Sequence, residues 1–160
     1  MFYRKLNFKK GFTIIELLVV VAIIAILSAV VITALSGGRG KGINAGVKNN
    51  LNNARTQAEV FYNTNTVSNL SYNNVCTNGV VGGVEGVGAL VLAAAKARGF
   101  SSYSTNAIGT VSNAVCNNSA NFWAAQVALL GDEFWCVDSS NQSKQVASSV
   151  ITATNDYSCN

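Results

Sequence analysis

Apolar residues are concentrated in one uninterrupted block near the N-terminus. Residues 12–35 read FTIIELLVVVAIIAILSAVVITAL, and Glu16 is the only charged residue among them. A helix of this length, with a rise of about 1.5 Å per residue, spans roughly 36 Å, which is enough to cross the hydrocarbon core of a bilayer. The pattern therefore predicts a hydrophobic membrane-spanning helix over residues 12–36.

A different pattern follows this block. Between residues 44 and 63 the apolar positions recur mostly every three or four residues, which is typical of an amphipathic helix. We expect residues 37–63 to continue the first helix, with the apolar face packed beneath a sheet. Four glycines near the junction are the nearest helix breakers, and we place any flexible point there. The glycines are Gly37, Gly38, Gly40 and Gly42, and the apolar positions are Val47, Leu51, Ala54, Ala58, Phe61 and Tyr62.

The remaining chain, residues 64–160, is expected to form a globular head. Residues 64–83 are rich in Asn, Ser and Gly and are predicted to be a loop. Helical spacing of Val and Leu then predicts a short helix at about 86–98, which Gly99 can cap. The glycines before this helix do not form a phosphate-binding loop, because no Gly-Lys-Ser/Thr follows them.

The C-terminal third has the pattern of strands. In residues 122–130 apolar side chains alternate, with Trp123, Ala125, Val127 and Leu129 on one face. Residues 134–138 form a second short apolar run, and residues 144–151 can pair back on it, which predicts three or four antiparallel strands. The competing prediction is a helix at 120–130, since alanine favours helices. The expected fold class is α+β, a long N-terminal helix packed on a small antiparallel sheet.

The charge distribution argues against a function that rests on overall basicity. The formal net charge is +4, but the four basic residues of the first eleven account for all of it. A chain starting at Phe12 has a formal charge of zero, so no specific nucleic-acid partner is predicted. A sparse basic stretch remains at Arg39, Lys41, Lys48 and Arg55. We interpret it as a solvated or membrane-proximal face, with DNA contact as the alternative.

The same charges predict a membrane orientation. The basic flank MFYRKLNFKK precedes the apolar block, so the positive-inside rule keeps this flank cytoplasmic and sends the C-terminal bulk across the membrane. The block is too long for the apolar core of an ordinary secretory signal peptide. A simple anchor fits its length but does not explain Glu16. A carboxylate in such a run is either retained for a partner or solvated at the headgroup level.

The residues around Glu16 decide between these two interpretations. The segment Lys10–Val20, KGFTIIELLVV, resembles the class III signal of type IV prepilins and pseudopilins. The resemblance implies a pilin-like fold, removal of residues 1–11 by a prepilin peptidase that cuts between Gly11 and Phe12, and N-methylation of Phe12. It also implies that Glu16 serves assembly by neutralising the Phe12 amine of a neighbouring subunit. The chain departs from many family members in lacking a proline within the apolar block.

The resemblance further implies a structural subunit of a type IV pilus-like extracellular filament. Its partners would be other pilin subunits, the prepilin peptidase, an inner-membrane assembly platform and, before assembly, membrane lipid. The subunit would cross the inner membrane once and then move to the cell surface. The alternatives are a pseudopilin of a type II secretion or DNA-uptake system and a membrane-anchored extracellular binding module that never polymerises. Adhesion, motility, secretion and DNA uptake all stay open.

Four cysteines lie far apart in the sequence, at Cys76, Cys116, Cys136 and Cys159. The chain contains no C-x-x-C motif and no histidine, so zinc and thioredoxin-like redox sites are poorly supported. For a chain carried across a membrane we expect two disulfides, in one of three connectivities. Many pilins close a C-terminal loop with a disulfide, and this resemblance favours Cys136–Cys159 together with Cys76–Cys116.

We expect no enzymatic activity, no metal site and no cofactor. Without histidine the chain cannot form a Ser-His-Asp or Cys-His system, and its carboxylates are few and scattered. We expect Asp138 to form a turn with Ser139 and Ser140. Three aromatic residues could stack on bases or sugars if exposed, but we predict core packing for them. They are Trp123, Trp135 and Tyr103.

Overall fold

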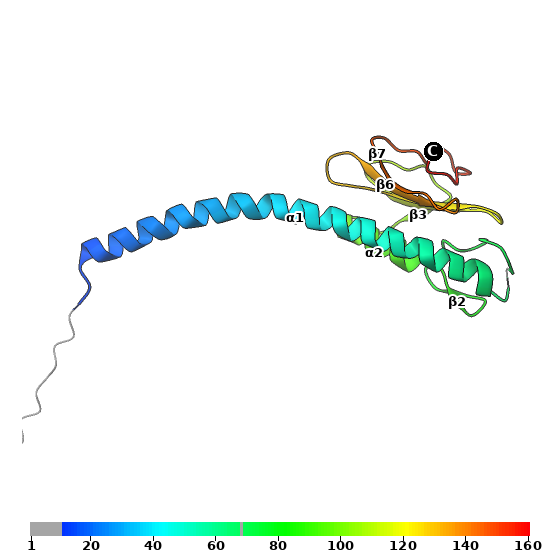
Figure 1. Cartoon of the computed structure of the whole chain (residues 1–160), viewed down its shortest axis with the longest axis horizontal. Coiled ribbons are helices and arrows are strands. Elements are labelled where there is room, and N and C mark those ends of the chain that lie inside the picture. The colour runs from blue at the N-terminus through cyan, green and yellow to red at the C-terminus, as the bar shows by residue number, and fades with distance from the viewer. Residues whose placement is uncertain (1–10, 68) are drawn as a thin grey trace, which may run out of the picture. The chain divides into compact units, whose positions relative to one another are not determined.

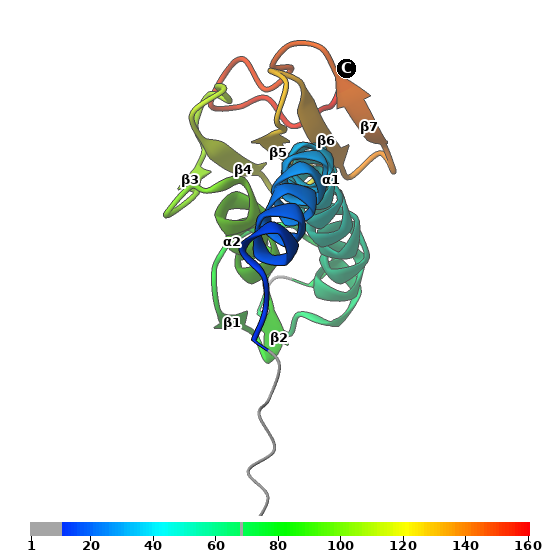
Figure 2. The same cartoon turned by 90° about the vertical axis from the view of Figure 1, so that its left-hand side faces the viewer.

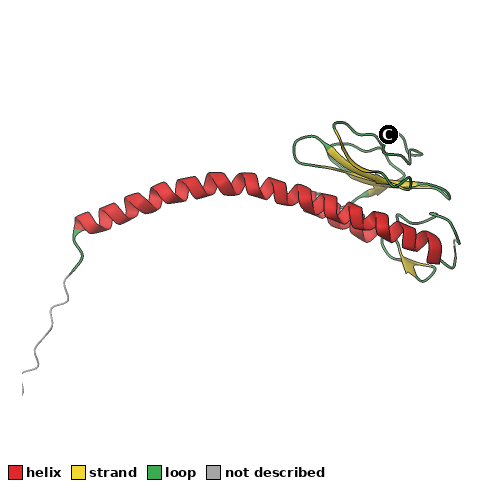
Figure 3. Cartoon of the chain, in the orientation of Figure 1, coloured by secondary structure: helices red, strands yellow, loops and turns green. Residues whose placement is uncertain are grey.

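The structure, a computed structural model, describes residues 11–67 and 69–160, so the basic leader at residues 1–10 lies outside the described residues. It contains one long helix, one short helix and small sheets, and the predicted α+β class is confirmed (Figures 1 and 3). The helices are α1 (Ile14–Thr64) and α2 (Gly88–Arg98). The strands are β1 (Val80–Val81), β2 (Val84–Glu85), β3 (Ser104–Thr105), β4 (Ala114–Asn118), β5 (Trp123–Ala128), β6 (Phe134–Asp138) and β7 (Ser143–Val146).

The chain divides into two compact units, residues 1–39 and residues 40–160, and α1 contributes to both. In the first unit the apolar side chains are exposed, from Phe12 at 84% to Leu35 at 69%. By length and composition α1 is able to cross a membrane, as the apolar block predicts. The helix continues through the four glycines between positions 37 and 42.

The second unit, called the head below, has its main core between helices and sheet. The predicted amphipathic face of α1 is confirmed, since Val47, Leu51, Ala54, Ala58 and Phe61 are all fully buried. They pack with buried residues of α2 and of the large sheet. The α2 helix corresponds to the helix predicted at 86–98 and ends at Gly99, whose φ of 103° is left-handed and suits glycine.

The large sheet has the strand order β3-β4-β5-β6-β7. Strands β4 to β7 are antiparallel neighbours, whereas β3 pairs parallel to β4. The strands predicted at 122–130 and 134–138 are confirmed, and the competing helix at 120–130 is wrong. The sequence pattern did not predict β3 and β4, and it assigned to a loop the stretch that contains β1, which pairs with β2. Figure 2 shows α2 and the second half of α1 on one face of the large sheet.

The other face of this sheet is covered by the C-terminal segment, defined here as residues 147–160. A small second core lies between them. Its residues are Val115, Ala124, Cys136, Ile151 and Cys159. The sheet is therefore buried on both faces, which explains why all six residues of β5 are buried although their polarity varies.

Three buried polar side chains, one on each of three adjacent strands, hold the C-terminal segment. The Asn117 amide donates to the carbonyl oxygens of residues 153 and 156, at 3.1 and 3.3 Å. The Gln126 Oε1 atom accepts from the backbone N–H groups of residues 150 and 151, at 3.0 and 3.4 Å. Asp138 Oδ2 accepts from the Cys159 N–H at 2.8 Å. Polar groups on the sheet thus satisfy the backbone of a segment that forms no strand.

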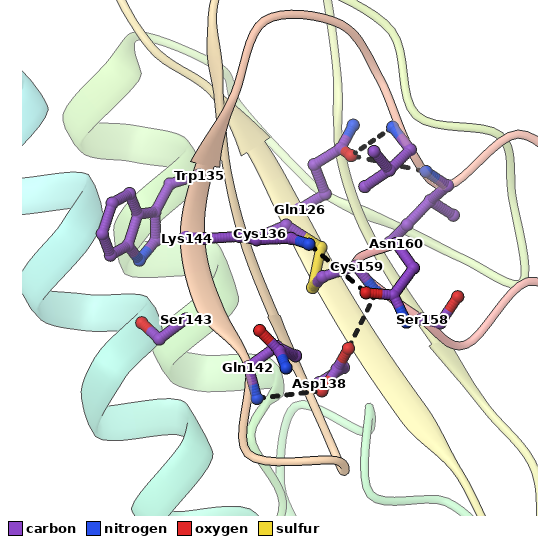
Figure 4. Close-up of a disulfide and its surroundings, with 12 residues drawn as sticks. Gln126, Trp135, Cys136, Asp138, Gln142, Ser143, Lys144, Ser158, Cys159 and Asn160 are labelled. Atoms are coloured by element: carbon purple, nitrogen blue, oxygen red, sulfur yellow. Dashed lines mark hydrogen bonds between the residues drawn. A yellow bond between two sulfur atoms is a disulfide. The ribbon is translucent and has the colours of Figure 1, made fainter.

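The expectation of two disulfides is confirmed. One joins Cys76 in the loop after α1 to Cys116 on β4, and the other joins Cys136 on β6 to Cys159. Figure 4 shows the second disulfide beneath the C-terminal segment, close to Asp138 and Lys144. Each disulfide links the sheet to a segment with little regular structure, and the two segments lie on opposite faces of the sheet.

The loop after α1 is also fixed by Tyr72. Its hydroxyl donates to Glu59 Oε1 at 2.8 Å, and its backbone N–H donates to the Ala120 carbonyl at 2.9 Å. Burial raises the pKa of Tyr72, and the Glu59 carboxylate adds to this rise. The hydroxyl therefore remains a hydrogen-bond donor at neutral pH, and it ties the loop to α1.

Candidate processing and assembly site

The candidate site begins where α1 begins. Thr13 is the N-cap, since its carbonyl accepts the first helical hydrogen bond, from Leu17 N at 3.2 Å. The Thr13 Oγ1 atom accepts from Glu16 N at 3.2 Å. In return, Glu16 Oε2 accepts from Thr13 N at 2.8 Å and from Thr13 Oγ1 at 2.9 Å. This reciprocal arrangement is a capping box, in which a threonine and a glutamate three residues later satisfy N–H groups at a helix start.

Sequence reasoning missed the role of Thr13. The pattern Thr13-Ile14-Ile15-Glu16 is the Ser/Thr-x-x-Glu/Gln signature of a capping box, and it directly precedes an apolar run. The pattern therefore fixes the start of the helix. It also gives Glu16 a structural role within its own chain, besides the assembly role that the resemblance implies.

Gly11 and Phe12 precede the helix and are exposed, Phe12 at 84%. A Cβ atom added to Gly11 would meet nothing within 4 Å. The peptide bond between them therefore lies in accessible, non-helical chain, where a protease can bind the backbone in an extended form. The capping box places the start of the rigid helix immediately after this bond.

The carboxylate of Glu16 is favourably placed for a positive partner. It lies in the first turn of α1, where a negative charge complements the helix dipole. Its hydrogen bonds to Thr13 use Oε2, and no described residue donates to Oε1. One carboxylate oxygen is thus open to a further donor. The exposed apolar side chains around Glu16 would exclude water from such a contact once other helices cover them.

The other predicted residues lie in the head. Trp123 is fully buried, which confirms core packing. Trp135 is half-buried beneath Lys48, whose Nζ lies 4.9 Å from the ring centre, and Tyr103 donates to the Cys76 carbonyl at 2.6 Å. Asp138 forms the predicted turn, since its Oδ1 accepts from residue 140 at 2.9 Å. Among the described residues, no group of His, Cys, Asp or Glu could hold a metal ion.

Comparison with known proteins adds one finding. Residues 6–32 match the family model described as the prokaryotic N-terminal methylation motif, while no curated protein and no solved structure matches the chain. This motif is the class III prepilin signal of type IV pilins and pseudopilins, and the matched range includes Gly11, Phe12 and Glu16. The motif indicates a type IV pilin-like or pseudopilin precursor, which is a structural protein.

Proposed function

We propose that this chain is the precursor of a structural subunit of a type IV pilus-like extracellular filament. A prepilin peptidase cuts between Gly11 and Phe12 and N-methylates Phe12, and Glu16 then serves assembly. The observation that carries this proposal is the match to the methylation motif at residues 6–32. The geometry supports it, because the proposed scissile bond is accessible and a capped helix with an open carboxylate oxygen follows at once.

Cleavage creates a positive charge next to a negative one. The new Phe12 amine and Glu16 both lie in a strongly apolar part of the chain. Two charges are tolerated in such surroundings only when they pair. In the filament, Glu16 of one subunit pairs with the Phe12 amine of its neighbour. The pair fixes the axial register between neighbouring helices. Uniform surfaces of Leu, Ile and Val alone would let the helices slide along one another.

The exposed apolar surface of the first unit has two successive environments in this proposal. Before assembly it lies in the inner membrane, with the leader on the cytoplasmic side and the head across the membrane. An assembly platform in that membrane then adds the subunit to the filament, where neighbouring helices replace lipid. The two disulfides of the head support export, since disulfides persist in oxidising compartments.

The test is mass spectrometry and N-terminal sequencing of protein recovered from filaments sheared off the cell surface. We expect a chain that begins at methylated Phe12 and weighs four hydrogens less than its fully reduced form, as two disulfides require. An unprocessed chain starting at Met1 and confined to the membrane would refute the proposal and leave a simple anchored module. A processed chain absent from sheared filaments would instead favour a pseudopilin.

A further inference from the structure

Three basic residues gather at the end of the head where α1 enters it. The α2 helix runs antiparallel to the second half of α1. A Cβ atom on Gly46 would lie 3.5 Å from that of Ala97, and the Gln57 amide donates to the Glu85 carbonyl, just before α2, at 2.7 Å. The last turn of α2, with two of these residues, therefore lies beside the first turns of α1 within the head. We call Lys41, Lys96 and Arg98 the entry cations.

The entry cations are available to an outside partner. Lys41 and Lys96 are exposed, and the half-buried Arg98 guanidinium lies 5.4 Å from the centre of the Phe100 ring. No described carboxylate lies within 4.0 Å of any of these cationic nitrogens. Lys48 differs from them, because its Nζ donates to Gln145, which in turn donates to the Glu133 carboxylate.

Negative charge is mostly placed elsewhere in the head. Glu59 and Glu85 are exposed and lie toward the opposite end of the α1–α2 pair. The exceptions lie in the turn between β5 and β6, where Asp132 is exposed and Glu133 is half-buried and accepts from Gln145. That turn lies near the entry end, because Asn44 exchanges hydrogen bonds with the backbone of Leu130. The head is therefore polarised, with an excess of cations at its entry end.

The sequence places this end near a membrane surface. Lys41 follows Leu35, the last residue of the apolar block, by six positions. In a helix that rises about 1.5 Å per residue the separation is roughly 9 Å, slightly more than the roughly 5–7.5 Å of one headgroup layer and within reach of a lysine side chain. The separation along the chain places Lys41 directly, and Lys96 and Arg98 follow because the last turn of α2 lies beside the first turns of α1 within the head.

We propose that the entry cations bind the phosphates of anionic phospholipids in the leaflet that faces the head. The proposal rests on the proposed function, since it requires the first unit to span a bilayer. Lys and Arg near a membrane surface attract anionic headgroups, and Arg can bind a phosphate through two hydrogen bonds. The contact holds the head against the membrane, so extraction of the subunit into a filament must break it.

The same cations fit a nucleic acid less well. A strand would need a continuous basic groove with exposed rings on which bases can stack. In the head, Lys48 and Arg55 already donate to neutral acceptors, and Trp135 and Tyr103 are engaged in packing and hydrogen bonds. A bilayer surface requires only that the cations share one end of the domain, as they do here.

The test measures lipid selectivity of the full chain in phosphatidylcholine bilayers. Spin-labelled phosphatidylglycerol and spin-labelled phosphatidylcholine are compared by electron paramagnetic resonance, which gives their relative association constant at the protein surface. We expect K41Q/K96Q/R98Q to lower the preference for the anionic lipid by at least roughly fivefold, since each fully engaged cation contributes about that factor. Asp132→Asn should raise the preference, because it removes the exposed carboxylate at the same end.

Two control variants, and their combination, remove positive charge from elsewhere in the head. Lys144→Gln and Arg55→Gln each remove one positive charge from sites whose side chains donate to Asn160 and to the Asn141 carbonyl. Both should leave lipid selectivity unchanged, and the leader cations contribute equally to every variant. The thermal stability of each variant, measured in parallel, separates lost lipid contacts from a misfolded head.

The outcomes separate this inference from the proposed function. Equal selectivity in the parent chain and the triple variant overturns the inference, even if the chain inserts and assembles normally. A triple variant that keeps its lipid selectivity but loses filaments also overturns it, and assigns the cations to a contact between copies. If free inorganic phosphate, added at constant ionic strength, abolishes the preference for anionic lipid, soluble phosphate is the ligand and the inference is overturned. A parent chain that fails to insert into bilayers refutes the proposed function instead.

Discussion

The two units use the same apolar residue types in opposite ways. Leu35 in the first unit is 69% exposed, whereas Leu51, about four helical turns further along the same helix, is fully buried. The head supplies partners for its own apolar face from α2 and the sheet. Among the described residues none covers the apolar side chains of the first unit, so this surface requires lipid or other helices. One continuous helix thus combines a surface for assembly with a core for folding.

The polar groups follow the same division. In the first unit Thr13 is the one described residue that donates to the Glu16 carboxylate, which stays exposed. In the head, Asn117, Gln126 and Asp138 are fully or almost fully buried and bonded to backbone. The three buried side chains in the head have their hydrogen-bond partners once the head folds. The Glu16 carboxylate has one oxygen to which no described residue donates. Substitutions in the two units should therefore affect different measurements.

The largest expected effect comes from Glu16→Gln. In the proposed assembly, this variant removes the charge that pairs with the Phe12 amine, so we expect surface filaments to be lost. The neutral amide keeps an oxygen that can cap the helix, and the head contains no part of this site. The measurement is the amount of sheared surface protein, with head unfolding followed by circular dichroism. Normal filaments from this variant would show that assembly does not require the negative charge of Glu16.

Next in size is a matched pair of leucine substitutions. Leu51→Ala leaves a cavity between α1 and the sheet and should lower the free energy of unfolding of the head by about 2–5 kcal/mol. Leu35→Ala makes the same chemical change in the first unit and should leave head unfolding unchanged. Denaturant titration of both variants tests the contrast. Equal destabilisation by the two would show that the units are not independent.

Removal of the second disulfide should have a comparable but more local effect. The chain-entropy model gives about 3 kcal/mol for the Cys136–Cys159 loop, with its sequence separation of 23. We expect the C136S/C159S variant to lose hydrogen-exchange protection first at Val150 and Ile151, while the core beneath α1 stays protected. The C76S/C116S variant is the control, since it loosens the opposite face of the sheet. Protection unchanged at both residues would argue that the polar contacts alone hold the segment.

The smallest effect is expected at the glycines of α1. Added Cβ atoms at Gly37 and Gly38 would meet nothing within 4 Å, so alanine fits there without strain. Each substitution should stabilise the local helix by about 0.5–1 kcal/mol. Hydrogen exchange of amides 37–42 in bilayer-inserted protein should slow, with head unfolding unchanged. Faster exchange would mean that these glycines have a packing role not visible in a single chain.

Much of the fold could be predicted from the sequence because strong local patterns coincide with real elements. The apolar face from Val47 to Phe61 was predicted to be buried and is buried. The alternation in residues 122–130 predicted one buried face of β5 but not the burial of its other face, at Ala124, Gln126 and Ala128. The β3 and β4 strands escaped prediction, since Asn117 and Asn118 make β4 look like a loop. The burial of Asn117 depends on the C-terminal segment, which contacts this residue only through tertiary hydrogen bonds that local patterns do not contain.

The candidate site was predictable for a different reason. Gly11, Phe12 and Glu16 are close in sequence, so their spacing alone identifies the motif. The capping role of Thr13 was equally local and was missed. The entry cations could not be predicted as a group, because Lys41 and the last turn of α2 come together only through antiparallel packing of two helices. Residues distant in sequence become one surface only after folding.

The capping box also has a consequence for the order of events in assembly. Glu16 already accepts two hydrogen bonds from Thr13 of its own chain. A neighbouring amine that approaches through Oε1 can add to these bonds, whereas one that displaces them must exchange contacts within a subunit for a contact between subunits. In the second case the start of α1 loosens as the contact between subunits forms. The free energy of that contact is then reduced by the free energy of the lost hydrogen bonds between Thr13 and Glu16. In a subunit that is still in the membrane, the hydrogen bonds between Thr13 and Glu16 would then disfavour pairing of Glu16 with another subunit's amine before assembly.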